Sequence, residues 1–251
     1  MKKLIIFIVA GIAALAATSC DKDNTLRYNN FTMGNIVDGK FVSDQGNTFN
    51  VVEQTCSGRL DTLKRAIVLC DVLYQEEGGD YAVRLTNFQR VLAKSPVKSS
   101  ETTDESILTQ DPIILSDLWV SGGYINMRLT LPVKIDSNQP HIINLLFDDT
   151  DKTEGTYKFT LLHNAGGEVL KNDASNNDMY LANAYVSFPI TSIIPDETAK
   201  IWLSWTSYKV NSQYMVSSDT VEKTYEFNYV KGTFEQAPTE GVAKISSFSL
   251  R

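Results

Sequence analysis

The acidic run Asp148–Gly155 holds the residues best suited to bind a metal ion. Carboxylate and hydroxyl oxygens alternate at Asp149, Asp151 and Thr153, and oxygen ligands of this kind suit Ca²⁺. A calcium loop of the EF-hand type also needs glycine at its sixth position and glutamate at its twelfth, and the run supplies neither. We interpret it as a polar turn between strands, and no metal site is predicted.

Two other combinations of reactive residues are weaker candidates for a metal site or a catalytic site. His141 and His163 are the only histidines of the chain, and no third ligand lies at metal spacing from them. Ser95 and Lys98 fit the S-x-x-K pattern of serine acylases, but Pro96 interrupts the helical turn that this chemistry needs. No nucleophile-elbow, P-loop or dinucleotide pattern is present. The sequence therefore predicts neither a catalytic residue nor a cofactor.

The start of the chain predicts that one cysteine is lipidated. Two lysines precede an apolar run from Leu4 to Ala17, which is too short to span a membrane, and small residues lead into Cys20. This pattern is typical of a lipoprotein signal peptide over residues 1–19, cleaved before Cys20, with acyl chains then anchoring the protein. Ordinary signal-peptide cleavage, with Cys20 unmodified, is the alternative.

Cys56 and Cys70 are the remaining cysteines. A hairpin that turned near Arg59–Asp61 would place them opposite each other, and an exported protein can keep a disulfide. Cys70, however, lies in a run of apolar residues, where a thiol also serves as a small buried hydrophobe. A disulfide and two free thiols both remain open.

Charge narrows the range of partners. Removal of the signal peptide leaves 21 basic and 30 acidic residues, a net charge of −9. Lysine and arginine do not cluster, which argues against nucleic acid and against charge-driven binding to anionic lipids. The expected membrane contact is the lipid anchor alone.

Hydrophobic patterning predicts an all-β protein with two domains. Residues 20–32 are polar and are interpreted as a tether, and residues 96–106 have the composition of a linker. Between them, residues 33–95 form a β domain with strands predicted at 33–38, 40–43, 48–54, 65–75 and 80–92. Residues 107–251 alternate in polarity as in an immunoglobulin-like antiparallel β-sandwich, with strands predicted at 113–120, 124–133, 141–148, 155–162, 179–190, 199–208 and 221–230.

Three aromatic side chains lie on the polar faces of these strands. Tyr124 lies opposite the apolar face of its strand, and Trp202 and Tyr208 lie opposite Trp205, which is predicted to be in the core. Such residues can face a ligand, cover the contact between two domains or pair across strands. All three uses remain open.

The order of these segments resembles that of the NigD-like lipoproteins of Bacteroides and Prevotella. The resemblance rests on RAIVLCDVLYQEEGGDYAVRLTNFQRVLAKSP, DLWVSGGYINMRLTLPV, HIINLLFDD, GTYKFTLLHNAGG and IWLSWTSY. It implies that residues 33–95 form an OB-like small barrel and that a β-sandwich follows. It supplies no catalytic residues, and the family name carries a bacteriocin-immunity role as a hypothesis.

The same bacterial group implies two features of the mature chain. Asp21 and Asp23, flanking Lys22 just after the lipidated cysteine, resemble a signal for export to the cell surface, with a plain solvated tether as the alternative. Thr62 and Thr220 each follow aspartate and precede an apolar residue, which resembles an O-glycosylation site.

The expected function is that of a non-catalytic binding or interaction module on the outer membrane. An OB-like barrel in the envelope suggests a glycan or protein ligand, without nucleic acid. The expected location is the cell surface, with the periplasm-facing leaflet as the alternative. A bacteriocin immunity protein is the first alternative function, and an envelope enzyme is the second.

Overall fold

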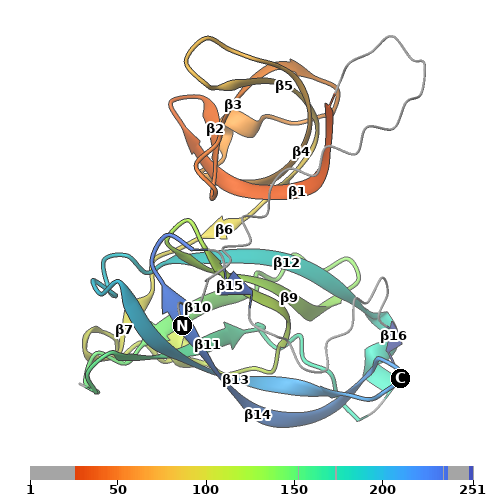
Figure 1. Cartoon of the computed structure of the whole chain (residues 1–251). Helices are drawn as coiled ribbons and strands as arrows, with labels where there is room; N and C mark the ends of the chain where they lie inside the picture. The colour runs from red at the N-terminus through yellow and green to blue at the C-terminus, as the bar shows by residue number, and fades with distance from the viewer. Residues whose placement is uncertain (1–25, 152, 173, 234, 237–248, 251) are drawn as a thin grey trace, which may run out of the picture.

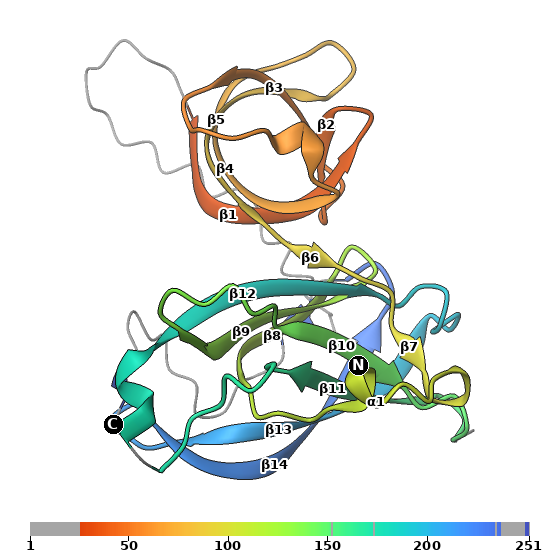
Figure 2. The same ribbon diagram turned by 180° about the vertical axis from the view of Figure 1, so that it is seen from behind.

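The computed structural model describes residues 26–151, 153–172, 174–233, 235–236 and 249–250 of the chain. Almost every described element is a β-strand, which confirms the all-β fold. Figures 1 and 2 show a small barrel stacked on a sandwich of two sheets. Within the described ranges, no helix is long and apolar enough to cross a bilayer.

The barrel closes in the strand order β1-β2-β3-β5-β4. Its strands lie at β1 (Leu26–Val37), β2 (Lys40–Ser43), β3 (Thr48–Gln54), β4 (Arg65–Gln75) and β5 (Tyr81–Arg90). The β3–β5 pair is parallel and the other four pairs are antiparallel. A single 3-10 turn, η1 (Leu60–Thr62), lies between β3 and β4.

All five strands predicted for the barrel are present, but β1 is longer than predicted. Residues 26–32 were predicted to be part of a tether, but Leu26–Tyr28 pair with β4 and, after a register shift, the pairing resumes at Thr32. The long strand β4 would otherwise have an unpaired edge on this side, and closure of the barrel removes that edge. The polar composition of this segment conceals the pairing, because the pairing is made by the backbone.

The sandwich contains the seven predicted long strands. One sheet has the order β15-β8-β9-β12-β6 and the other β16-β14-β13-β11-β10-β7. The long strands are β8 (Ile114–Ser121), β9 (Tyr124–Lys134), β10 (Ile142–Phe147), β11 (Thr156–Asn164), β12 (Met179–Pro189), β13 (Thr198–Val210) and β14 (Met215–Val230). Among these long strands one pair, β11 with β13, is parallel, which alternation of polarity alone does not reveal.

The sandwich core consists of the alternating residues that face inward from both sheets. All seven long strands contribute to it, and β9 and β13 contribute most, including Ile125, Met127, Leu129, Ile201, Leu203 and Trp205. The predicted core position of Trp205 is confirmed.

The remaining elements are short. The segment after the barrel adds a strand to each sheet, since β6 (Leu92–Ala93) pairs with β12 and β7 (Val97–Lys98) pairs with β10. Residues 96–106, interpreted as a linker, thus include β7, and this segment lies along the sandwich. The other short elements are η2 (Ser99–Glu101), α1 (Glu105–Leu108), η3 (Ala174–Asp178), β15 (Glu235–Gln236) and β16 (Ser249–Leu250).

Candidate functional site

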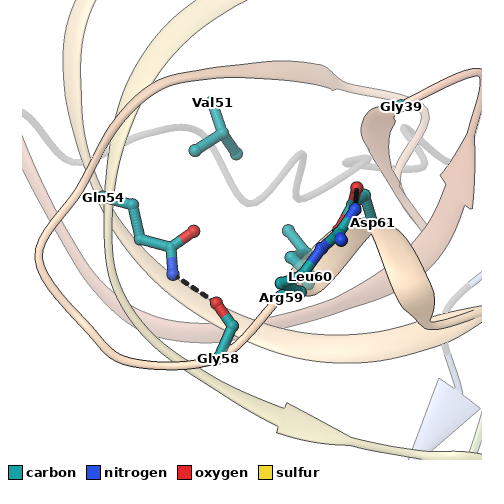
Figure 3. Close-up of a pocket in the computed structure, with 7 residues that line it drawn as sticks. All are labelled: Gly39, Val51, Gln54, Gly58, Arg59, Leu60 and Asp61. Atoms are coloured by element: carbon teal, nitrogen blue, oxygen red, sulfur yellow. Dashed lines mark hydrogen bonds and ion pairs between the residues drawn. The ribbon is translucent and has the colours of Figure 1, made fainter.

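A pocket of about 310 Å³ lies at one end of the barrel (Figure 3). The β1–β2 turn lines it on one side, and β3, η1 and the segment between them line it on the other. Its lining residues are Gly39, Val51, Gln54, Gly58, Arg59, Leu60 and Asp61. The pocket thus combines two apolar side chains with an amide, a guanidinium and a carboxylate.

An ion pair between Arg59 and Asp61 forms the polar part of the pocket. The Arg59 Nε donates to Asp61 Oδ1 at 3.2 Å, and a terminal nitrogen donates to Oδ2 at 2.7 Å. This hydrogen bonding lowers the pKa of the Asp61 carboxyl and raises the pKa of Arg59. Both side chains are more than half exposed, so water competes for the pair and a ligand can reach it.

Hydrogen bonds from Gln54 hold the segment between β3 and η1 in its tight path. Its Nε2 donates to the carbonyl oxygen of Cys56 at 2.7 Å and to that of Gly58 at 2.8 Å (Figure 3). Gly58 has a φ of +97°, and a Cβ there would lie 2.9 Å from the ring of Phe88. Because only glycine accepts this conformation and this contact without strain, the loop places Arg59 at the rim and Leu60 in the core.

The barrel is fixed to the sandwich by a buried arginine, Arg65, at the start of β4. All five of its N–H donors are used: Nε donates to Ser187, one terminal nitrogen to Asn35 and Asp44, and the other to Asp44 and Asn126, at 2.6–3.0 Å. The side chains of Arg65 and Asp44 are 0% and 2% exposed. Because Ser187 and Asn126 belong to the sandwich, the pair joins the two domains.

Asp44 receives further contacts from the sandwich. The hydroxyl of Ser121 donates to its Oδ2 at 2.5 Å. At Gly122, in the β8–β9 turn, φ is +57° and a Cβ would lie 2.4 Å from the Asp44 carboxylate. Apolar contacts continue the interface, where Met33, Ile67 and Val91 pack with Trp119 and Tyr185. The two domains therefore meet through a packed contact and not only through the connecting chain.

The three aromatic candidates have three different environments. Tyr124 packs between the domains, with the Arg65 guanidinium carbon 4.0 Å from its ring centre. The ligand-facing interpretation is wrong for Tyr208, which is 1% exposed. The β11–β12 connection covers it, and the Leu170 N–H donates to its phenol oxygen at 3.0 Å. Burial raises the pKa of Tyr208 to about 12.

Trp202 alone of the three is open to solvent, with 39% of its surface exposed. It lies on the outer face of β13, in register with Lys158 on β11 and Glu226 on β14. Its surroundings are therefore polar side chains on a sheet face.

Cys56 and Cys70 are free thiols in the structure. The hairpin that would have placed them opposite each other does not form, because β5 lies between β3 and β4. Cys70 is buried in the barrel core, and burial raises the pKa of its thiol to about 11. It serves as a small hydrophobe there.

The acidic run binds its own chain. Asp148 Oδ1 accepts hydrogen bonds from the amide and hydroxyl of Thr150 at 3.1 and 2.6 Å, and Asp151 is ion-paired with Lys158. The hydroxyls of Ser99 and Ser100 donate to Asp149. Among the residues that the structure describes, no group of three or more potential ligands is placed to hold a metal ion.

The remaining predicted site residues differ in what the structure says of them. Thr62, at the end of η1, and Thr220, on β14, are both exposed, and their glycosylation stays a prediction. Cys20, Asp21, Lys22 and Asp23 lie outside the described residues. Sequence reasoning missed the Arg65–Asp44 pair, whose only signal was a charged residue at the head of a strongly apolar strand.

Comparison with known proteins agrees with this architecture. Residues 95–229 match the model of the NigD-like C-terminal β-sandwich domain. No curated protein matches the chain significantly.

Several solved structures share the fold. One is a protein of unknown function from Bacteroides vulgatus, with 22% identity, a TM-score of 0.57 and coverage of 80% of this chain and 90% of that one. A NigD-like immunity protein from Bacteroides caccae has 19% identity, a TM-score of 0.56 and coverage of 80% and 96%. A candidate lipoprotein from Bacteroides fragilis has 14% identity, a TM-score of 0.50 and coverage of 78% and 95%.

Proposed function

The chain belongs to the NigD-like family, and on this basis we propose that it is a lipid-anchored envelope protein that acts as a non-catalytic binding module. The lipoprotein pattern ending in Cys20 supports the anchor, as does the name of the similar candidate lipoprotein from Bacteroides fragilis. The observation that carries the binding role is the pocket at the barrel end. The buried Arg65–Asp44 pair holds the barrel, and the pocket with it, in a fixed position on the sandwich.

The chemistry of the lining favours binding over catalysis. Its two charged groups, Arg59 and Asp61, neutralise each other. Its other side chains are the amide of Gln54 and the apolar groups of Val51 and Leu60. A nucleophile activated by an adjacent base is the usual requirement of covalent catalysis, and the lining holds no serine, cysteine or histidine. Ligand capture is the use that these groups support.

A protein ligand fits the pocket better than a glycan. Its volume of about 310 Å³ is at the small end of the range for ligand pockets, and it has room for a side chain of a partner. No aromatic residue lines it to stack on a sugar ring. The immunity role named for the relative from Bacteroides caccae is one form of protein capture, in which the partner is a toxin.

Reversal of the charge at the pocket should abolish capture of a partner. We expect Asp61→Arg to place two cationic side chains at the rim of the pocket. When intact cells are treated with a chemical cross-linker, the yield of the complex between this protein and its partner should then fall by at least tenfold. Glu77→Arg is the matched control, because it makes the same charge change at an exposed position in the β4–β5 turn. Equal yields for both variants would contradict the pocket assignment.

The immunity form of the proposal has a separate readout. A strain lacking the protein should become sensitive to one toxin. Glu77→Arg should restore resistance and Asp61→Arg should not.

Trp202 supports a glycan as the second candidate ligand, since an exposed indole among polar side chains can stack on a sugar ring. If so, Trp202→Ala weakens glycan binding about tenfold and changes the free energy of unfolding by about 0.5 kcal/mol or less, as is usual for a surface position. Glycan-array binding and urea denaturation of the same samples measure the two effects. Unchanged binding together with clearly lower stability would assign the indole to packing instead.

A further inference from the structure

The two histidines of the chain form a buried pair at the loop end of the sandwich. His141 precedes β10 and His163 lies near the end of β11. His141 Nδ1 and His163 Nε2 are 2.9 Å apart, and the rings stack with centroids 5.2 Å apart. The His163 residue is 1% exposed and the His141 side chain 10%. One ring must donate a hydrogen to the other at this distance.

Glu168 determines the direction of that hydrogen bond. Its Oε2 lies 3.2 Å from His141 Nε2 and accepts the Lys134 amide at 3.0 Å. Hydrogen bonds from Ser137, Lys134 and His141 lower the pKa of the Glu168 carboxyl, which is therefore ionised at neutral pH. A carboxylate can only accept, so His141 donates from Nε2, and its Nδ1 accepts the N–H of His163.

This arrangement leaves one ring nitrogen without a hydrogen-bond partner. The Nδ1 of His163 is buried and has no hydrogen-bond partner. The backbone carbonyl of Pro112 can accept a hydrogen bond once this ring is protonated, and it raises the pKa of His163. An unpaired buried polar atom is costly, and a single added proton would satisfy it.

We propose that His141, His163 and Glu168 form a proton-binding clasp that closes with one proton and opens with a second. The first proton binds to His163 Nδ1. The proton on His163 Nε2 then transfers to His141 Nδ1, so the positive charge rests on His141 beside the Glu168 carboxylate. Every ring nitrogen then carries a hydrogen or accepts one, and no charge is left unpaired. The second proton creates two imidazolium rings whose facing nitrogens are 2.9 Å apart, and they repel.

Burial opposes that second proton most strongly. Desolvation, and then the charge of His141, lower the pKa of His163 from 6.5 to about 4, although Asp111 acts in the opposite direction. The folded protein thus binds this proton about 300-fold less tightly than the unfolded chain does. As the pH falls, the unfolded chain binds this proton at a higher pH than the folded protein does. The contribution of neutral His163 to the free energy of unfolding is therefore fully present above pH 6.5 and is lost as the pH falls from 6.5 to 4.

Opening of the clasp would separate the loops that meet at this end of the sandwich. A Cβ at Gly166 would lie 2.3 Å from the Gln139 amide, which shows how closely the β9–β10 and β11–β12 loops approach. Asp111 ties a third segment to the pair, since its N–H donates to the His163 carbonyl and its carboxylate accepts the Ala165 N–H, both at 2.8 Å. Two other ionisable side chains nearby carry little net charge, because Lys134 is paired with Asp178 and the Tyr208 phenol is neutral.

Nuclear magnetic resonance of the two imidazoles tests the clasp directly, because the whole protein contains only two histidines. We expect the first proton to convert His163 to the Nδ1–H tautomer and the ring of His163 to become charged only near pH 4. Amide exchange at Ala165 and Asp111 should then accelerate while the barrel amides stay protected. Two rings that titrate independently near pH 6.5 would overturn the proposal, and so would exchange at these amides that does not change with pH.

Two variants separate the clasp from general acid sensitivity. Glu168→Gln keeps a side chain of the same shape but removes the charge, so the pair should take its first proton at least tenfold less readily. His141→Asn removes the repelling partner, and His163 should then bind its proton more tightly. Glu77→Arg, in the barrel, should leave both titrations unchanged. Results that contradict the clasp would leave the binding proposal for the barrel pocket standing, since the two sites share no residue.

Discussion

Replacement of Arg65 with methionine is expected to lower the free energy of unfolding by about 3–5 kcal/mol, the cost of removing one partner of a buried ion pair. The Asp44 side chain is 2% exposed and would lose its main hydrogen-bond donors without gaining access to water. Asn126, Ser187 and Asn35 would each lose a hydrogen bond as well. Urea denaturation measures the loss, and the barrel should unfold at a lower urea concentration than the sandwich.

The control for this result is the same substitution at a different ion pair. Arg59→Met removes the exposed pair with Asp61, where water and salt already screen the charges, and it should leave the urea midpoint nearly unchanged. The double variant Arg65→Met with Asp44→Asn should recover part of the loss, because no carboxylate charge remains buried without a partner. Similar small effects at Arg65 and Arg59 would show that the interdomain pair does not stabilise the protein.

Removal of the proposed lipidation site should have an all-or-none effect on location. Cys20→Ala leaves no sulfur to acylate, and each methylene of an acyl chain contributes about 0.8 kcal/mol to membrane binding. With two or three chains lost, the protein should move from the membrane fraction to the soluble fraction after cell breakage. Fractionation followed by immunoblotting measures the shift.

Cys56→Ala is the matched control for this variant, because it changes a half-buried thiol in the barrel and should leave the protein on the membrane. A Cys20→Ala protein that stayed there would mean that another segment anchors it. Protease treatment of intact cells, with lysed cells alongside, tells whether the protein is exposed on the cell surface. Digestion of the wild type on intact cells is the result expected if Asp21 and Asp23 act as a surface-export signal.

Local patterns predicted the strands well because buried apolar residues and exposed polar residues alternate along a strand. In β9, Ile125, Met127 and Leu129 are all buried, as a period of two requires. The same reasoning could not detect the parallel β11–β13 pair or the length of β1. Both depend on which strands become neighbours, and backbone pairing leaves little trace in side-chain type.

The candidate site was harder to predict for a related reason. Tyr208 fits the outer face of its strand by position, but a loop nearly forty residues earlier in the chain, which carries Leu170, covers it. Arg65 and Asn126 are 61 positions apart, and the two histidines are 22 apart. Such long-range contacts arise from the packing of the domains and loops, and the spacing of residues along one strand does not predict them.

The pairing of β1 also determines how the protein carries a mechanical load. The chain enters the barrel at Leu26, at the beginning of β1, and β1 pairs antiparallel with β4 as far as Asn35 opposite Arg65. Hydrogen bonds in such a ladder run perpendicular to the strands. Tension applied along β1 from a membrane anchor would therefore shear many of these bonds together instead of unzipping them one by one. When flow pulls on a bound partner, the force transmitted to the anchor would thus load the barrel in the direction in which the β1–β4 pairing is mechanically strongest.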